Sequence, residues 1–287
     1  MVMPFRLTNV PSAFQKFIND IFSDLLDITV TIYLDNILIY SNDLSKHKEH
    51  VCKVLCRLQK HGLYCHLDKC KFSVDSIECL GFILSKDGLK MDSAKIQTIM
   101  DWPEPRKVED IQSFLGFANF YHHFISDYSK IVVLLTCLTH KGTQWNFTDK
   151  AQKSFNALKA AFTFALVLVN WEPDKPLIVE MDASDFALGA IISIISDSSD
   201  IHPVAFYSHN FTSPEQNYDT HDKELLTIFD AFHVWQHYLE GSSTPIDVVT
   251  DHKNLEYFST TKILTHQQVR WSEFLSRFNL VICFHPG

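Results

Sequence analysis

The spacing of apolar residues changes twice along the chain, and the three patterns predict three structural regions. Up to about residue 90, two apolar stripes at helical spacing, over residues 11–27 and 45–61, are separated by short extended runs. One run, TIYLDNILIY at 31–40, predicts a tight hairpin, because the pair Asp35-Asn36 interrupts it and tolerates the positive φ of a two-residue turn. Further short strands are predicted in the segments GLYCHL, KCKFSV and IECLGFILS.

The pattern becomes helical over residues 91–165. Asp92 or Ser93 can cap a helix that extends to about Trp102, after which Pro103 breaks the chain. The segment VEDIQSFLGFANFYHHFI then predicts a strongly apolar helix. This region has no alternation of the kind that predicts a strand.

After Pro176 the apolar residues alternate again, which predicts a sheet. Three successive strands are expected in LIVEMDAS, ALGAIISII and HPVAFYS, followed by a long helix from about Pro214 to Leu239. The strand IDVVT, a helix near 266–278 and the strand LVICF complete the chain. Strands interleaved with helices predict a mixed α and β domain.

Composition narrows the class of protein. With 287 residues, 46% of them hydrophobic, the chain has enough apolar surface for one large or two compact globular domains. No apolar run approaches the ~20 residues that span a membrane, so no membrane partner is expected. The seven cysteines are odd in number and lack the spacing of a disulfide framework, which predicts reduced thiols in an intracellular protein.

The charge is distributed unevenly. A net charge of −9 argues against a uniformly basic nucleic-acid surface. Between residues 46 and 71, however, basic side chains far outnumber acidic ones. We predict local phosphate contacts in this segment, through Lys46, Lys53, Arg57, Lys60, Lys69 and Lys71. A solvated helix face explains the same charges equally well.

Three carboxylates in the last third of the chain occupy suggestive positions. Asp182 and Asp251 each end a predicted strand, and Glu224 precedes the apolar stripe of the long helix by one residue. Two strand ends and a helix can converge, and clustered carboxylates repel one another unless a divalent cation neutralises them. Two Mg²⁺ ions held by such a cluster are typical of phosphodiester cleavage. Ordinary surface acids are the alternative, and Asp35 taken alone is most simply a turn residue.

Several motifs occur in an order and at a spacing that resemble one family. They are MPFRLTNVPSAFQKFIND, YLDN, HLDKCKF, LGFILSKDG, QSFLGFANFY, MDASDFALGA, HDKELL and TDHKNLEYF. Over essentially the whole chain they resemble the reverse transcriptase–ribonuclease H region of gypsy-type LTR retrotransposon polyproteins. The resemblance implies an α+β and α/β fold. It divides the chain into the C-terminal part of a polymerase palm (1–90), a helical thumb or connecting region (91–165), and a ribonuclease H-like mixed five-stranded sheet with helices but without its last helix (166–287).

The resemblance also implies roles for individual residues. Tyr33 and Asp35 match the YxDD motif, whose acids help to hold the polymerase metals. The carboxylates that match the ribonuclease H site are Asp182, Glu224 and Asp251. The implied cofactors are two Mg²⁺ or Mn²⁺ ions, and the implied partner is an RNA/DNA hybrid or a primer-template. A cytoplasmic location follows by resemblance only, and no oligomeric state is predicted.

The departures from the family's pattern lie mostly at residues that the resemblance implies in catalysis. Asn36 replaces the second Asp of YxDD, and Arg6 stands where the family has a Gly that lies against nucleotide and template. The family's first polymerase Asp is expected upstream of MPF, and a fourth ribonuclease H carboxylate beyond HPG. We therefore expect polymerase activity to be lost and RNA cleavage to be impaired, which leaves open whether the chain is an enzyme. The alternative is a non-catalytic retrotransposon-derived relic, or a domesticated protein that binds nucleic acid or protein.

Overall fold

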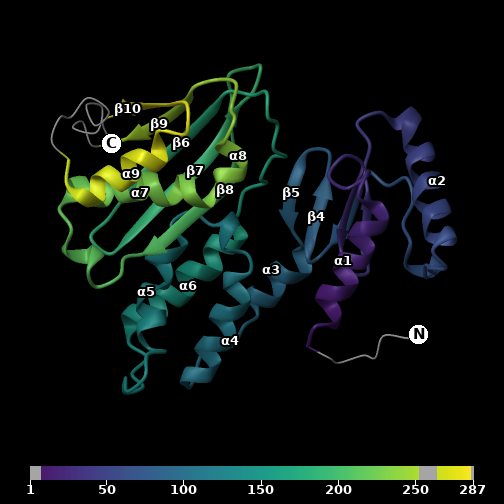
Figure 1. Ribbon diagram of the computed structural model, residues 1–287. Helices are drawn as coiled ribbons and strands as arrows, with labels where there is room; N and C mark the ends of the chain where they lie inside the picture. The colour runs from purple at the N-terminus through teal and green to yellow at the C-terminus, as the bar shows by residue number, and fades with distance from the viewer. Residues whose placement is uncertain (1–7, 252–263, 286–287) are drawn as a thin grey trace. The chain divides into compact units, whose positions relative to one another are not determined.

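The computed structural model describes residues 8–251 and 264–285 and divides into two compact units, residues 1–74 and 75–287. Figure 1 shows the helices and strands of both units. Each unit has hydrophobic residues buried within it.

The first unit packs two helices against a two-stranded hairpin. Its elements are α1 (Val10–Phe22), β1 (Val30–Tyr33), β2 (Asn36–Ile39), α2 (Leu44–Lys60) and the 3-10 helix η1 (Leu67–Lys69). The residues buried at its centre include Ile18, Phe22, Val30, Val54 and Leu58. Asp43 caps α2 by accepting a hydrogen bond from the Ser45 N–H at 2.9 Å. The helix ends just before Gly62, whose φ of 68° is typical of a residue that terminates a helix.

The predicted hairpin is present, but its turn lies one residue earlier than predicted. Tyr33 pairs with Asn36 across the two strands. The loop residues are therefore Leu34 and Asp35, and Asn36 belongs to β2. Leu34 adopts the positive φ of the turn (53°) while its N–H donates to Gln15 Oε1 at 2.6 Å. A contact with α1 thus helps to set this turn, and local residue preference alone did not locate it.

The segment between α2 and the second unit's helices differs from the prediction. GLYCHL and KCKFSV contain no strand, because residues 62–75 form loops around η1. IECLGFILS forms two strands rather than one, β3 (Ser76–Cys79) and β4 (Phe82–Ser85), and β5 (Gly88–Met91) follows. Gly81 takes a φ of 82° in the turn between β3 and β4. The apolar run continues through this turn, so periodicity did not reveal it.

Residues 92–165 are helical, as predicted. The elements are α3 (Ser93–Met100), α4 (Val108–Asn119), η2 (His122–Phe124), α5 (Tyr128–Cys137) and α6 (Asp149–Thr163). Asp92 caps α3 by accepting from the Ala94 N–H at 2.9 Å. The apolar helix predicted over VEDIQSFLGFANFYHHFI ends at Asn119, and its last residues form η2. Phe114 and Phe155 pack against each other in the core between α4 and α6, with ring centroids 4.5 Å apart.

Five strands form one mixed sheet in the order β10-β9-β6-β7-β8, which confirms the predicted five-stranded mixed sheet. They are β6 (Leu177–Ala183), β7 (Ala187–Ile195), β8 (Ile201–Asn210), β9 (Ile246–Thr250) and β10 (Leu280–Phe284). β6 pairs antiparallel with β7 and parallel with β9.

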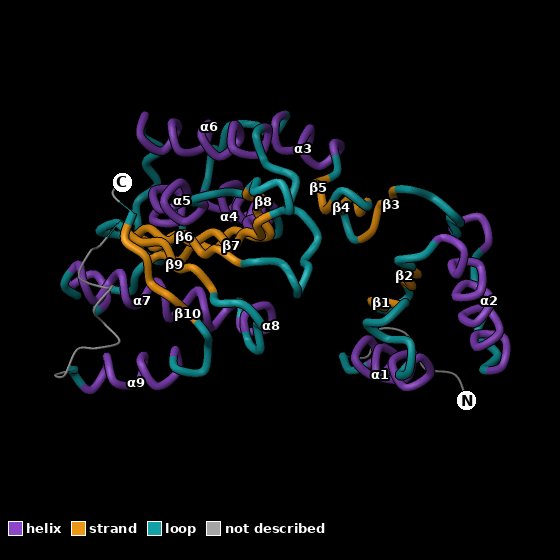
Figure 2. The backbone as a smooth tube through the Cα atoms, turned by 90° about the horizontal axis from the view of Figure 1, so that it is seen from above, coloured by secondary structure: helices purple, strands orange, loops and turns teal. Residues whose placement is uncertain are grey.

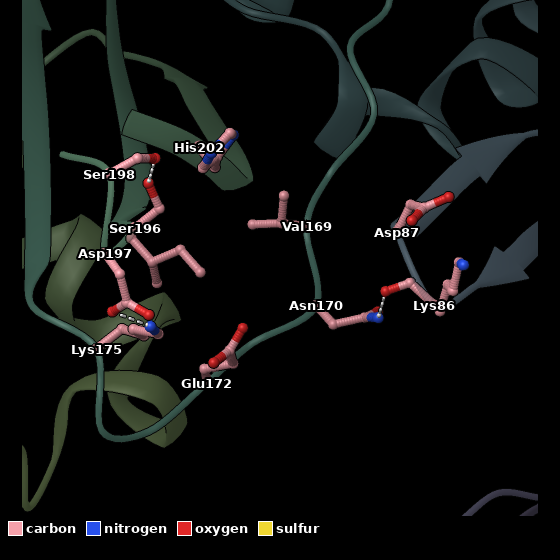
Figure 3. A pocket seen from close by; sticks show the side chains of 11 residues that line it. Lys86, Asp87, Val169, Asn170, Glu172, Lys175, Ser196, Asp197, Ser198 and His202 are labelled. Atoms are coloured by element: carbon pink, nitrogen blue, oxygen red, sulfur yellow. Dashed lines mark hydrogen bonds and ion pairs between the residues drawn. The ribbon is translucent and has the colours of Figure 1, made fainter. Parts of the chain in front are cut away.

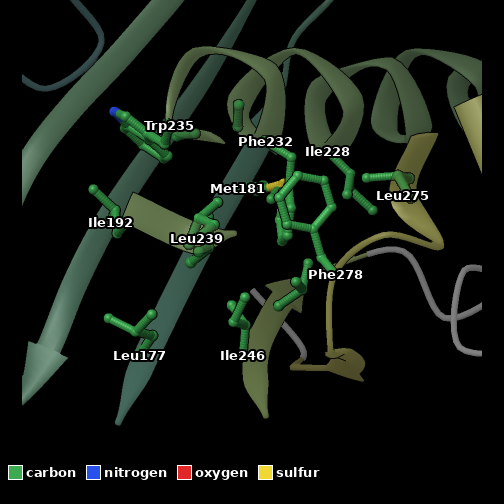
Figure 4. Packing of buried hydrophobic residues seen from close by; sticks show 14 of the residues in the cluster. Leu177, Met181, Ile192, Ile228, Phe232, Trp235, Leu239, Ile246, Leu275 and Phe278 are labelled. Atoms are coloured by element: carbon green, nitrogen blue, oxygen red, sulfur yellow. The ribbon is translucent and has the colours of Figure 1, made fainter. Parts of the chain in front are cut away.

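Helices cover both faces of this sheet (Figure 2). One face carries α7 (Thr220–Val234), α8 (Gln236–Leu239) and α9 (His266–Leu275), and the other carries α5, against which α6 packs. Apolar side chains from the strands and from these helices form the core under α7 (Figure 4). They include Leu177, Met181, Ile192, Ile228, Phe232, Ile246 and Leu275.

The single helix predicted from Pro214 to Leu239 is interrupted in the structure. A short 3-10 helix, η3 (Glu215–Asn217), precedes α7, and the chain leaves helical geometry at the buried Trp235. Apolar spacing continues across that break, which is why the pattern predicted one helix.

The predicted domain boundaries near residues 90 and 165 stay a prediction. Both boundaries lie inside the second compact unit. Because compact units are defined by packing, they do not show whether two segments packed together belong to different domains of the family. No helix in the described part of the chain is long and apolar enough to cross a membrane.

Gly88 allows a close contact between β5 and the segment that leads into the sheet. Its φ is 133°, and a Cβ at this position would lie 2.1 Å from the Leu168 carbonyl oxygen. Next to it, the Leu89 N–H donates to Leu168 O at 2.7 Å, and the Leu168 N–H donates to Leu89 O at 3.0 Å. Only glycine permits this approach without displacing the backbone.

Gly88→Ala should therefore lower the free energy of unfolding by about 2–4 kcal/mol, since it combines a forced positive φ with a backbone clash. Gly116→Ala is the matched control, because Gly116 lies inside α4 with nothing within 4 Å of its Cβ position. That variant should gain about 0.5–1 kcal/mol from helix propensity. Denaturant unfolding followed by circular dichroism measures both. Equal stability of the two variants would contradict the predicted role of Gly88.

Candidate active sites

Asp182 and Asp251 lie side by side at one end of the sheet. β6 and β9 run parallel, and their last register pair is Glu180 with Val249. Asp182 follows Glu180 by two residues at the end of β6, and Asp251 directly follows the last residue of β9. The structure thus brings these two predicted site residues together at the carboxyl ends of neighbouring strands.

Glu224 reaches the same end of the sheet from α7. Its side chain is only 3% exposed, and its carboxylate accepts hydrogen bonds from the Thr250 hydroxyl at 3.4 Å and from the Ala183 N–H. Burial, followed by the charges of Asp251 and Asp182, raises the pKa of Glu224 to about 7. Glu224 is therefore close enough to Asp251 and Asp182 to be repelled by both, and it retains a substantial share of its proton near neutral pH.

A cation that the sequence pattern did not single out contacts this site. Lys130 of α5 forms ion pairs with Asp182 and with Asp127, the latter at 2.9 Å. Side chains alternate along β6, so Met181 lies in the core under α7 while Asp182 faces α5. No periodicity connects a helix residue with a strand residue 52 positions away, and Lys130 could be found only from the fold.

The donor set at the end of β6 and β9 suits a hard divalent cation. Carboxylate oxygens are the ligands that Mg²⁺ and Mn²⁺ prefer, and a bound cation would relieve the repulsion that raises the pKa of Glu224. Among the residues that the structure describes, no three acidic, His or Cys side chains already form a group that could hold a metal ion. Asp182 is directed toward Lys130. Shared ligation by all three carboxylates therefore requires Asp182 to separate from Lys130.

Asp35 occupies a different site, in the first unit. It is part of the two-residue turn of the hairpin, followed by the exposed amide of Asn36. Gln15 braces the turn, donating to Ile32 O at 3.2 Å and accepting from the Leu34 N–H. The turn thus presents one carboxylate and one neutral amide. Arg6, the other predicted departure, lies outside the described residues.

Five of the six basic side chains predicted to contact phosphate are exposed. On α2 they recur at seven-residue intervals, which places Lys46, Lys53 and Lys60 on one stripe of the helix. Lys69 and Lys71 are exposed in and after η1. The stripe includes an ion pair within the helix, between Lys53 and Glu49 at 2.7 Å.

Arg57 is held by a structural contact. Its guanidinium pairs with both carboxylate oxygens of Asp24 and donates to the Ile21 carbonyl oxygen at 3.1 Å. The ion pair with Asp24 raises the pKa of Arg57. Arg57 therefore ties α2 to the end of α1, and it is the least available of the six for phosphate.

A pocket of about 490 Å³ lies far from the carboxylates (Figure 3). It includes Ile194, which pairs with Leu177 at the start of β6, roughly 17 Å along the strand from Asp182. Lys175 at its edge is paired with Asp197 at 2.5 Å. The pocket contains none of the predicted site residues, and its position gives it no part in their chemistry.

Two sequence families match the chain. The family described as "Reverse transcriptase (RNA-dependent DNA polymerase)" matches residues 1–84, and the family described as "RNase H-like domain found in reverse transcriptase" matches residues 172–278. The matched segments contain the Asp35 hairpin and the three carboxylates of the sheet, respectively. Both families generally use divalent metal ions.

Similar proteins are found among curated sequences and solved structures. The Transposon Tf2-7 and Tf2-3 polyproteins of Schizosaccharomyces pombe are each 32% identical over 289 residues, covering 100% of this chain and 22% of the relative. The chain therefore spans about a fifth of the length of these relatives.

The foamy viral protease-reverse transcriptase in complex with an RNA/DNA hybrid has a TM-score of 0.80 at 23% identity, covering 99% of this chain and 39% of that one. The same protein in complex with dsDNA has a TM-score of 0.80 at 22% identity, covering 99% and 60%. At these identities the likeness establishes the fold alone. From the sequence matches, the chain contains reverse transcriptase and RNase H-like domains and is homologous to the Tf2 transposon polyproteins.

Proposed function

We propose that this chain is a segment of the RNA-directed DNA polymerase and ribonuclease H region of a gypsy-type LTR retrotransposon polyprotein. Its remaining chemistry is divalent-metal-dependent cleavage of the RNA strand of an RNA/DNA hybrid. The observation that carries the proposal is the meeting of Asp182, Glu224 and Asp251 at one end of the sheet, with Glu224 buried and its pKa raised by burial and by the other two. A structural neighbour binds an RNA/DNA hybrid, which makes this nucleic acid the first substrate to test.

Each of the three carboxylates is proposed to supply ligands to the divalent cations. Asp182 at the end of β6 and Asp251 just after β9 would supply oxygen ligands. Glu224 of α7, which accepts a hydrogen bond from the Thr250 hydroxyl, would supply a further ligand after releasing its proton. When bound, the divalent ions neutralise charge at the scissile phosphate and activate the attacking water.

The polymerase site is proposed to be inactive. Asp35 stands alone in the hairpin turn, and the neighbouring Asn36 offers no negative charge. A pair of hard divalent ions needs more anionic ligands than one carboxylate supplies. By the family resemblance we also assign the chain to the cytoplasm and the exposed lysines of α2 to phosphate contacts.

A second candidate is a non-catalytic relic or a domesticated protein that binds nucleic acid or protein. The ion pair between Asp182 and Lys130 favours it, since an ammonium group already neutralises one of the proposed ligands. An assay of hybrid cleavage separates the two candidates, because a protein that only binds the hybrid retains it without cleaving it.

Asp182→Asn should lower the rate of hybrid cleavage roughly 100-fold or more, the scale of losing one group that stabilises charge in a transition state. The measurement is release of labelled RNA fragments in Mg²⁺ or Mn²⁺. Asp185→Asn, which neutralises an exposed carboxylate three residues later, is the matched control and should retain the wild-type rate. Hybrid binding without cleavage by the wild-type chain would instead favour the non-catalytic candidate.

Glu224 should make the metal-free protein less stable as the pH rises. Its pKa is raised from 4.5 to about 7, so between these values the folded state binds a proton that the unfolded state has lost. Stability therefore falls with rising pH across this window, by up to roughly 3 kcal/mol. Glu224→Gln should remove this fall and exceed the wild-type stability at pH 8.

The measurement is denaturant unfolding in EDTA at pH 5 and pH 8, expressed as the difference between variant and wild type. Glu273→Gln, which neutralises a carboxylate on α9 away from the site, should leave that difference near zero at both pH values. A parallel pH dependence in wild type and Glu224→Gln would mean that Glu224 titrates normally.

Replacing Lys46 and Lys60 together by Ala should weaken hybrid binding and flatten its salt dependence. Each phosphate contact contributes about 0.7–0.9 to the slope of log K against log salt, so the double variant should lose up to about 1.8 from the slope. Filter binding between about 50 and 200 mM KCl measures this, with Lys16→Ala on α1 as the control. An unchanged slope would assign these lysines to a solvated helix face.

A further inference from the structure

Lys130 links two carboxylates that belong to different elements. Its ammonium pairs with Asp182 at the end of β6 and lies 2.9 Å from an Asp127 oxygen at the start of α5. The Lys130 side chain is 27% exposed, so solvent screens this bridge only in part. One fixed cation is thus shared between a proposed metal ligand and an acid outside the site.

The surrounding structure holds Lys130 in this position. α5 is anchored to the sheet next to Lys130, where the Ser129 N–H donates to Ser208 Oγ of β8 at 2.9 Å. Tyr128 and Val132 on the same helix are buried in the helical core. Because α5 is anchored to the sheet and to the helical core, it holds the Lys130 ammonium in a fixed position.

A glycine in the sheet makes room for the second partner. Gly189 of β7 pairs in register with Asp182, and a Cβ on Gly189 would lie 2.9 Å from Asp127 Oδ1. Asp127 itself has a positive φ of 53°. Asp127, Asp182 and Gly189 line one small cavity of about 120 Å³. Asp127 can therefore receive the ammonium if Asp182 is taken by another cation.

We infer that Lys130 is a positioning residue of the proposed nuclease site. In the metal-free protein it neutralises Asp182 and directs that carboxylate toward α5, and it competes with a divalent cation for it. When a cation binds, Lys130 retreats to Asp127 alone. Metal loading is thereby coupled to the contact between α5 and the sheet. This inference rests on the proposed function, because it assigns Asp182 as a metal ligand.

Charge arithmetic sets the expected size of the effect. An ammonium about 6 Å from a doubly charged ion weakens its binding by about tenfold at the dielectric of bulk water. Removing the charge of Lys130 should therefore tighten divalent binding. Removing Asp127 should weaken it, because the ammonium then remains on Asp182.

The test is direct titration of the full chain with Mn²⁺, with free Mn²⁺ followed by electron paramagnetic resonance. Lys130→Met should bind Mn²⁺ about tenfold more tightly than wild type, and Lys130→Arg, which keeps the charge, should stay within about twofold. Asp127→Asn should bind about threefold more weakly. In the Lys130→Met/Asp127→Asn double variant most of that weakening should disappear, because Asp127 acts through Lys130.

The variants separate failure of this inference from failure of the proposed function. Asp182→Asn should lose most Mn²⁺ affinity; if it binds like wild type, the metal is elsewhere, and the proposed function fails together with the inference. If Asp182→Asn loses affinity but Lys130→Met binds no more tightly than wild type, the inference alone is overturned. An equal effect of Asp127→Asn in both backgrounds would overturn the shared-ammonium arrangement. Should Lys130→Met fail to fold, Lys130→Arg and Asp127→Asn still decide the matter.

Discussion

The candidate nuclease site depends on the register of β6 within the sheet. Pairing with β9 brings the end of β6 next to the end of β9, which Asp251 follows, and pairing with β7 sets Asp182 opposite Gly189, against which Asp127 packs. The buried apolar residues of β6, such as Val179, hold this register, because a slip by one residue would exchange the two faces of the strand. Such a slip would turn Asp182 into the core under α7. The apolar side of β6 thus fixes where its acidic side points.

The site concentrates negative charge that the fold neutralises in two reversible ways. Glu224 retains a proton up to a pKa of about 7, and Asp182 pairs with the ammonium of Lys130. The buried, partly protonated Glu224 is a local exception to the usual preference for exposed, ionised acids, and such exceptions are typical of functional sites. A divalent cation would replace both at once, releasing the proton and displacing the ammonium. The core under α7, where Ile228 and Phe232 are fully buried, supplies the stability against which this unfavourable charge is maintained.

The sequence predicted the helices and strands whose presence changes the spacing of apolar residues along the chain. All five strands of the sheet were found in this way, whereas the breaks at Gly81 and Trp235 leave the apolar spacing intact and were missed. The same limit applies at the candidate site. Asp182 and Glu224 were predictable because a strand end and a helix face mark their positions, and the sheet brings these elements together. Lys130 has no such marker, because its partner is set by how α5 docks on the sheet.

The Asp35 hairpin is held by residues other than the proposed polymerase carboxylate. Gln15 braces its turn and the burial of Val30 holds its first strand, and neither contact involves the side chains of Asp35 or Asn36. The contacts that hold the hairpin therefore do not depend on a carboxylate at its tip. At the nuclease site the reverse holds. Because Glu224 is buried there, and Lys130 pairs with a neighbouring acid, any change to these acids alters stability as well as chemistry. Replacing Glu224 at the candidate nuclease site is thus expected to change stability, whereas replacing an acid at the tip of the hairpin is not.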